Sequence, residues 1–205
     1  MRPATTKERK AARTRRMVLD AAERLFAERG FAGTSMRDVA RASGVSQALI
    51  HHHFGRKRDL YNAVKERVVQ RFLRMSSRPS GEPAPDVGTS ECWRWVISLF
   101  EFFRRNPRLV RLLSWERLEG SARLWPAEQK LLDAFRSLGA ELQRRGALRS
   151  DMNPLMLVAI LQSLVVSWWE NRAWIARLFP NQLRPDLEQL FLDHVTKLLE
   201  QGVKA

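Results

Sequence analysis

Three side chains close together in the sequence, Gln47, Ala48 and His51, have the chemistry to read base edges in DNA. A Gln amide can bond adenine through two hydrogen bonds, an Ala methyl can contact the thymine methyl, and a His ring can donate or accept. On a helix that begins at Gln47, these residues lie on the exposed side near its N-terminus. The sequence therefore predicts a DNA-reading helix over residues 47–54.

The elements that must position these residues lie within residues 34–54, TSMRDVARASGVSQALIHHHF. Residues 36–43 are predicted to form one short helix and residues 44–46 a tight turn. Gly44 can adopt the positive φ that ends a helix, and Ser46 can cap the next one. Two short helices joined by such a turn form a helix-turn-helix, over about residues 36–55, whose second helix can enter a major groove. The side chains expected to lock the pair together are Val39, Ala40, Val45, Ile50 and Phe54.

A second group of side chains suits the DNA backbone. Ser35 or Thr34 is expected to cap the helix over residues 36–43, where a hydroxyl and the free helix N–H groups can bind a phosphate. Arg37, in the first turn of that helix, can reach either a phosphate or a base.

Residues 13–73 resemble the DNA-binding domain of the tetracycline-repressor (TetR) family of bacterial regulators. The helix over residues 14–29, the Thr-Ser cap, the Gly-Val-Ser turn, the His-Phe end and the following Lys57 all fall in register. The resemblance implies that Met36 occupies a position where members often carry a base-reading residue. It also implies that His52 and Lys57 contact the DNA backbone.

The sequence departs from the family pattern in the second helix. Ala48-Leu49 replaces a common Gly-Thr pair, and His51 replaces the usual Tyr. Both changes remove a hydroxyl that members use near DNA.

Positive charge is concentrated at the N-terminal end of the chain, whose net charge is +14. Residues 1–75 hold 18 Lys and Arg against 7 Asp and Glu, whereas residues 76–205 hold 18 against 15. This asymmetry indicates a polyanionic partner, and it favours double-stranded DNA over a membrane surface. Residues 1–12 are expected to be a disordered basic arm that follows phosphates or enters a minor groove, or else a solubilising tail.

Other classes of function find little support. Adjacent helical residues point about 100° apart, so His51, His52 and His53 cannot converge on one ion and no metal site is expected. The single Cys92 excludes a disulfide within the chain. No Ser/His/Asp or Cys/His constellation has credible spacing, so we expect neither an enzyme nor a cofactor. No apolar segment follows the basic N-terminus as in a signal peptide, which favours a cytoplasmic protein.

The spacing of apolar residues is helical throughout and predicts an all-α protein of two domains. A helix over residues 57–75 is expected to link the DNA-binding domain, residues 13–73, to the rest of the chain. Residues 76–89 are rich in Pro and Gly and are predicted to be a linker. Five helices then form an effector-binding and dimerisation domain, residues 90–205. Their predicted ranges are 90–105, 107–119, 126–145, 154–178 and 185–201.

The last two helices are expected to form a homodimer interface. Residues 154–169 are apolar almost all round, so one side must be covered by the chain itself and the other by a partner chain. The resemblance implies that these helices pair with their counterparts in a four-helix interface. The expected interface residues are Leu161, Val165, Leu187, Leu190, Phe191, Val195 and Leu198.

A ligand pocket is also expected, because the family fold leaves a cavity in the larger domain and all seven Trp lie after residue 90. Glu116 falls on an apolar helix face, where it faces a ligand, pairs with a core Arg or lies at the dimer rim. An apolar or aromatic ligand with one cationic or donor group would suit this lining. Ordinary core packing without a cavity explains the same residues. The predicted lining is Trp95, Leu99, Phe103, Leu113, Glu116, Phe135, Trp168 and Trp169.

These patterns together predict a homodimeric transcription regulator, most simply a repressor released from a pseudo-palindromic operator by a small-molecule effector. The alternative is a sequence-tolerant architectural DNA-binding protein without an effector. Activator and repressor are not distinguished by the sequence.

Overall fold

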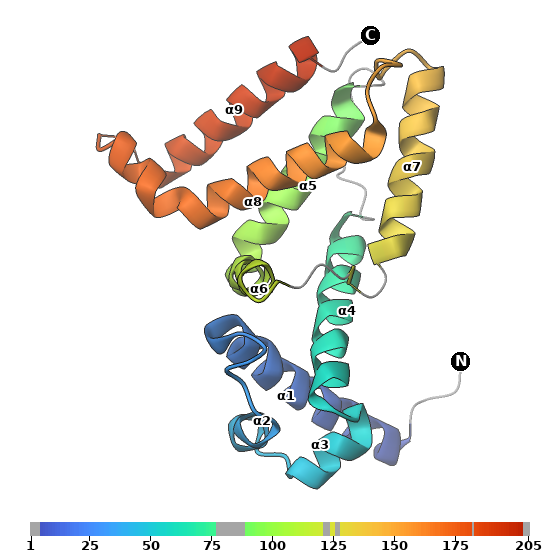
Figure 1. Cartoon of the computed structure of the whole chain (residues 1–205), viewed down its shortest axis with the longest axis vertical. Helices are drawn as coiled ribbons and strands as arrows, with labels where there is room; N and C mark the ends of the chain where they lie inside the picture. Colours follow the sequence, from blue (N-terminus) through green and yellow to red (C-terminus); the bar gives the residue numbers. More distant parts are fainter. Residues whose placement is uncertain (1–4, 77–88, 121–123, 126–127, 182, 203–205) are drawn as a thin grey trace. The chain divides into compact units, whose positions relative to one another are not determined.

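The computed structural model describes residues 5–76, 89–120, 124–125, 128–181 and 183–202, and it gives only the backbone for Ser76, residues 89–93, Arg184 and Glu200. All regular structure in these ranges is helical, which confirms the predicted fold class (Figure 1). The helices form two compact units. Unit 1 contains residues 1–70 and 107–127, and unit 2 contains residues 71–106 and 128–205.

Unit 1 contains the predicted helix-turn-helix. Helix α1 (Thr6–Arg29) packs against α2 (Met36–Ser43), and α2 packs against α3 (Gln47–Phe54). The first part of α4 (Lys57–Ser76) completes the bundle. Phe26 of α1, Ile50 of α3 and Leu60 of α4 are almost fully buried, so each helix contributes a large apolar side chain to one core.

Helix α1 is longer than predicted. The disordered arm was expected over residues 1–12, but residues 6–12 are helical; residues 1–4 lie outside the described part of the chain. Thr5 caps α1 and its side chain accepts a hydrogen bond from the Glu8 N–H, while the Glu8 carboxylate accepts from the Thr5 N–H at 2.6 Å. This capping box, followed by Lys, Arg and Ala residues with good helix propensity, extends the helix beyond the first buried residue.

Helix α6 (Pro107–Leu118) belongs to unit 1, although the sequence placed it in the larger domain. It packs against α1. The Arg111 guanidinium donates to the Ala27 carbonyl oxygen at 2.8 Å, and the Glu119 carboxylate accepts from the Ala32 N–H at 3.0 Å. These contacts hold the end of α1 and the loop before α2.

Unit 2 contains α5 (Thr89–Arg105), α7 (Glu128–Arg144), α8 (Pro154–Leu178), α9 (Arg184–Gly202) and the end of α4. Helix α8 packs against α5 and α7, and α9 packs against α5 (Figure 1). At Gly139, α7 approaches the start of α8 so closely that a Cβ atom would lie 2.2 Å from Cβ of Pro154. Only Gly fits at this crossing. The predicted linker, residues 76–89, lies almost entirely outside the described residues.

An aromatic cluster joins three helices of unit 2. The Trp168 ring stacks on the Phe191 ring with centroids 4.6 Å apart, and Phe100 lies 5.0 Å from Trp169 and 5.7 Å from Phe191. Such pairs stabilise a core beyond the area they bury. None of the described helices has the length and apolar character needed to cross a membrane.

Candidate nucleic-acid interface and ligand pocket

Ser35 caps α2, and Thr34 does not. The Ser35 hydroxyl accepts from the Asp38 N–H at 3.1 Å, and the Asp38 carboxylate accepts from the Ser35 N–H at 3.1 Å. The hydroxyl and N–H of Ser35 lower the pKa of the Asp38 carboxyl from its usual 3.8. Ser35 remains exposed near the N–H groups of α2, a geometry that suits a phosphate.

Thr34 is a structural residue in unit 1. Its side chain is only 1% exposed, and its hydroxyl donates to the Gly30 and Leu25 carbonyl oxygens at 2.9 and 3.2 Å. The prediction that the Thr34 side chain contacts DNA is therefore wrong, because the hydroxyl is turned into the core. Met36 is only 8% exposed and packs in the same core, which leaves little of it for base contact. Arg37, by contrast, is exposed.

The turn between α2 and α3 has the predicted chemistry. Gly44 has φ 68° and ψ 17°, in the left-handed region, and a Cβ there would meet no atom within 4 Å. Backbone conformation therefore explains the Gly at this position. The Ser46 hydroxyl caps α3 by accepting from the Leu49 N–H at 3.3 Å.

Gln47, Ala48, His51 and His52 are all exposed on α3. Nδ1 of His51 lies 2.9 Å from the Gly55 carbonyl oxygen, which requires it to be the protonated nitrogen that donates. In the neutral ring, Nε2 is then an acceptor, and Nε2 of Gln47 lies 3.4 Å from it. His51 thus orients the Gln47 amide, and one N–H and the carbonyl oxygen of Gln47 remain for an adenine edge.

Lys57 lies at the start of α4, half-buried against the loop before α2. Its ammonium is 4.3 Å from the centroid of the Phe31 ring and 3.5 Å from the Ala32 carbonyl oxygen. Burial lowers the pKa of Lys57, and the nearby Glu119 carboxylate opposes this effect. The geometry places the charge beside the loop that leads into the Ser35 cap.

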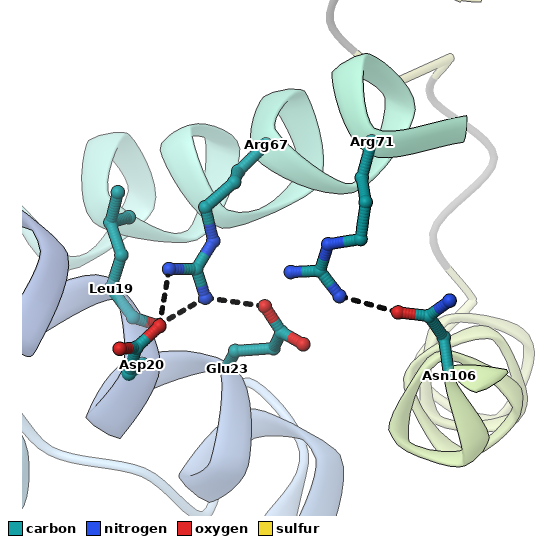
Figure 2. Close-up of polar contacts among 6 residues, drawn as sticks. All are labelled: Leu19, Asp20, Glu23, Arg67, Arg71 and Asn106. Atoms are coloured by element: carbon teal, nitrogen blue, oxygen red, sulfur yellow. Dashed lines mark hydrogen bonds and ion pairs between the residues drawn. The ribbon is translucent and has the colours of Figure 1, made fainter. Parts of the chain in front are cut away.

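Arg67 fastens α4 to α1 inside unit 1 (Figure 2). Its guanidinium donates to the carboxylates of Asp20 and Glu23 at 2.6 and 2.5 Å and to the Leu19 carbonyl oxygen at 3.0 Å. The sequence analysis did not identify this cluster, since charged residues on helices are usually solvated. Within unit 2, Arg71 donates to the Asn106 amide oxygen at 2.6 Å (Figure 2).

Glu116 is 6% exposed and is paired inside unit 1. Its carboxylate accepts from the Lys65 ammonium at 3.2 Å and from the Trp125 indole N–H at 2.5 Å. Burial raises the pKa of Tyr61, and the adjacent Glu116 carboxylate raises it further. The partner is a Lys rather than the expected Arg, and no ligand is required to satisfy this carboxylate.

Unit 2 contains a pocket of about 420 Å³, partly open to solvent, between α5, α7 and α8. Two predicted lining residues, Trp95 and Phe135, form part of its wall, with their rings edge to face and centroids 5.3 Å apart. Leu113 and Glu116 belong to unit 1, and Leu99, Phe103, Trp168 and Trp169 are buried in unit 2 away from this wall. Further wall residues are Leu138, Leu142, Leu157 and Leu161.

The predicted dimer residues are mostly turned into the chain. Val165 is 0% exposed, Leu161 lines the pocket, and Leu187 and Val195 are buried as well, so these four have almost no area left for a partner. Phe191 is half-buried in the aromatic cluster and Leu190 is also half-buried, whereas Leu198 is exposed. The apolar residues that α8 leaves exposed are Met156, Ile160, Leu164, Trp174 and Leu178.

The described residues include no group of three His, Cys, Asp or Glu side chains placed to hold a metal ion. In α3, His51 is directed to the backbone of Gly55, while His52 and His53 contact each other edge to face at 5.6 Å.

Two parts of the sequence match known families. Residues 18–64 match the bacterial regulatory proteins of the tetR family, and residues 92–187 match the tetracycline repressor-like C-terminal domain. The two matches together cover more than half of the chain and correspond to the helix-turn-helix and to most of the remaining helices.

Individual proteins show the same relationship. The HTH-type transcriptional repressor Rv3405c of Mycobacterium tuberculosis is 45% identical over 58 residues, which are 28% of this chain and 31% of that protein. The chain thus matches less than a third of that relative's length. The HTH-type transcriptional repressor SCO4008 of Streptomyces coelicolor is 26% identical over 76% of this chain and 77% of its own length.

A solved structure has the same fold. The transcriptional regulator SCO4942 of Streptomyces coelicolor superposes with a TM-score of 0.74 at 20% identity, covering 93% of this chain and 98% of the other. At this identity the similarity concerns the fold alone.

Proposed function

The chain belongs to the TetR family of bacterial regulatory proteins, and we propose that it is a DNA-binding transcription repressor, not an enzyme, that acts as a homodimer and is released by a small, largely apolar effector. The observation that carries the proposal is the surface of α3. Gln47, Ala48 and His51 are exposed together on a helix whose other side, at Ile50, is fully buried in unit 1.

The DNA contacts divide by chemistry. Gln47, oriented by His51, is assigned to a base edge, with Ala48 beside it for a thymine methyl. Ser35, Arg37, His52 and Lys57 are assigned to phosphates, which fix register but carry no sequence information directly. The double-stranded operator is therefore expected to contain an adenine at the position that Gln47 reads.

The proposed dimer uses the exposed apolar side of α8. Met156, Ile160 and Leu164 recur every four residues, so they lie on one face of the helix. A twofold dimer buries the same face of both chains and places two copies of α3 about 34–36 Å apart in successive major grooves. Leu198 of α9 is a further exposed apolar residue that such an interface would cover.

The pocket of unit 2 is the proposed effector site. An effector releases DNA only to the extent that it binds the DNA-incompetent state more tightly than the competent one.

The proposal is tested by selecting bound duplexes from a random DNA library with the purified protein. A repressor of this kind should enrich two half-sites in inverted orientation, with centres 10–10.5 base pairs apart or a multiple of this spacing. Gln47→Ala should still enrich DNA but lose the preference at one position of each half-site. Enrichment of no sequence would favour the architectural alternative, and a single half-site would contradict the dimer.

A further inference from the structure

The pocket of unit 2 has a wall with a single kind of chemistry. The side chains that form it are aromatic or aliphatic, and no charged side chain is among them. Trp95 of α5 and Phe135 of α7 form an aromatic corner, and Leu157 and Leu161 of α8 face them across the pocket. A wall of this kind favours apolar ligand surface.

Trp95 carries the one polar side-chain atom in this wall. Its indole nitrogen is buried, and it has no hydrogen-bond partner in the part of the chain that the structure describes. A buried donor without an acceptor costs free energy, and the cost is recovered when an acceptor arrives. Trp is a donor only, so the complementary ligand group must be an acceptor.

We propose that this pocket takes an uncharged, mainly apolar molecule with one hydrogen-bond acceptor, such as a carbonyl or ether oxygen, bound to the indole N–H of Trp95. The proposal rests on the proposed function, in which this pocket is the effector site, and it names the chemical class of that effector. It reverses the expectation from the sequence, where Glu116 indicated a ligand with a cationic or donor group. Glu116 is paired with Lys65 in unit 1, so it supplies no counter-charge here.

Charged ligands are disfavoured by the same wall. Moving an ammonium or a carboxylate from water into an apolar site without a partner is far more costly than moving a neutral ketone. The aromatic corner of Trp95 and Phe135 also suits a planar ring.

The test compares three probes with one ring system: naphthalene, 2-acetylnaphthalene and 2-naphthylmethylamine, the last protonated at pH 7. Isothermal titration calorimetry on the full chain should show 2-acetylnaphthalene binding about tenfold more tightly than naphthalene. The amine should bind more weakly than naphthalene. Equal binding of ketone and hydrocarbon, tightest binding of the amine, or no binding of any probe would each overturn the proposal.

Two matched variants locate the hydrogen bond. Trp95→Phe keeps an aromatic ring but removes the N–H, so the tenfold preference for the ketone should disappear while naphthalene still binds. Trp169→Phe is the control, because its indole nitrogen is also buried and unpartnered among the described residues but Trp169 does not line the pocket. If Trp169→Phe abolished the preference, or Trp95→Phe left it unchanged, the assignment would be wrong.

A spectroscopic readout covers the case in which Trp95→Phe does not fold. In protein labelled with ¹⁵N at Trp, one indole N–H resonance should move downfield on adding 2-acetylnaphthalene but not naphthalene. Binding with this signature but without DNA release would reject the effector role and keep the ligand class. Sequence-specific DNA binding without any probe binding would do the reverse.

Discussion

Lys65 of α4 and Glu116 of α6 are 51 residues apart in the sequence, and their Nζ and Oε1 atoms form an ion pair of 3.2 Å inside unit 1. The two side chains are 5% and 7% exposed. The Lys65 ammonium also lies 4.9 Å from the Tyr61 ring centroid and 5.5 Å from that of Trp125. A buried charge with such surroundings depends on its partner.

Removing either charge of this pair should therefore destabilise the protein strongly. Lys65→Met and Glu116→Gln should each lower the free energy of unfolding by about 3–5 kcal/mol, because each leaves one buried charge uncompensated or one buried partner unpaired. The double variant should lose clearly less than the sum, since the amide introduced at position 116 still offers Trp125 an acceptor and no net charge remains. Urea unfolding measures all three.

The exposed pair Arg136–Asp133 provides the control for this cycle. Arg136→Met should change the free energy of unfolding by less than about 1 kcal/mol, as is usual for surface pairs. If the Lys65 and Glu116 variants were equally mild, or if their effects simply added, the pair would not be coupled as the structure indicates.

Tyr61 provides a pH test, because it is the single Tyr of the chain. Burial and the Glu116 carboxylate raise its pKa well above the usual 10. A raised pKa means that the neutral phenol contributes stability below about pH 10 and that this stability is lost as the pH rises further. Absorbance near 295 nm should show no phenolate in the folded protein at pH 10–11, and phenolate should appear only together with unfolding.

Protein unfolded in urea serves as the reference for this titration, with a midpoint near pH 10. A folded-state midpoint at the same pH would show that Tyr61 is solvated, contrary to its position beside Glu116.

The helix-turn-helix is the part of the structure that the sequence predicted best. The bounds of α2 and α3, the Gly44 turn and the Ser46 cap were all predicted, because apolar periodicity and cap chemistry are local signals. The extension of α1 was missed because charged residues such as Lys7 and Arg9 make a good solvated helix without any apolar pattern.

Tertiary relationships were the harder part. The partner of Glu116 comes from a distant helix, which helical spacing in one segment does not reveal. The signal that was available is Lys65 itself, which directly follows the core residue Val64 on α4 and is buried with it. Helix α8 is apolar on nearly every side, so spacing alone did not separate the inward Leu161 from the outward Ile160.

The corrected face of α8 can be tested by its effect on assembly. Ile160 is 49% exposed, so Ile160→Glu should leave the fold intact and shift a dimer towards monomer in sedimentation experiments. Gln162→Glu, at an exposed position of the same helix, adds the same charge outside the Met156–Ile160–Leu164 stripe and should leave the dimer unchanged. A dimer that tolerates Ile160→Glu would require another interface.

The pair Gln47 and His51 makes a prediction about specificity. His51→Ala frees the Gln47 amide, so the preference for adenine at the position read by Gln47 should fall severalfold while binding to other DNA changes little. In a Gln47→Ala background, adding His51→Ala should not change that position further. Competition binding with single-base operator variants measures both effects, and an additive result would show that His51 reads a base itself.

The most direct test of sequence-specific regulation is fluorescence anisotropy on the selected operator and on scrambled DNA, across a salt series. The account predicts a specific-to-scrambled affinity ratio of about 10³ or more at about 0.15 M salt. Lys57→Ala should weaken binding to both DNAs and reduce the salt slope by about one. Equal binding to both DNAs that disappears as salt rises would mean that charge alone holds the DNA, and the repressor proposal would be contradicted.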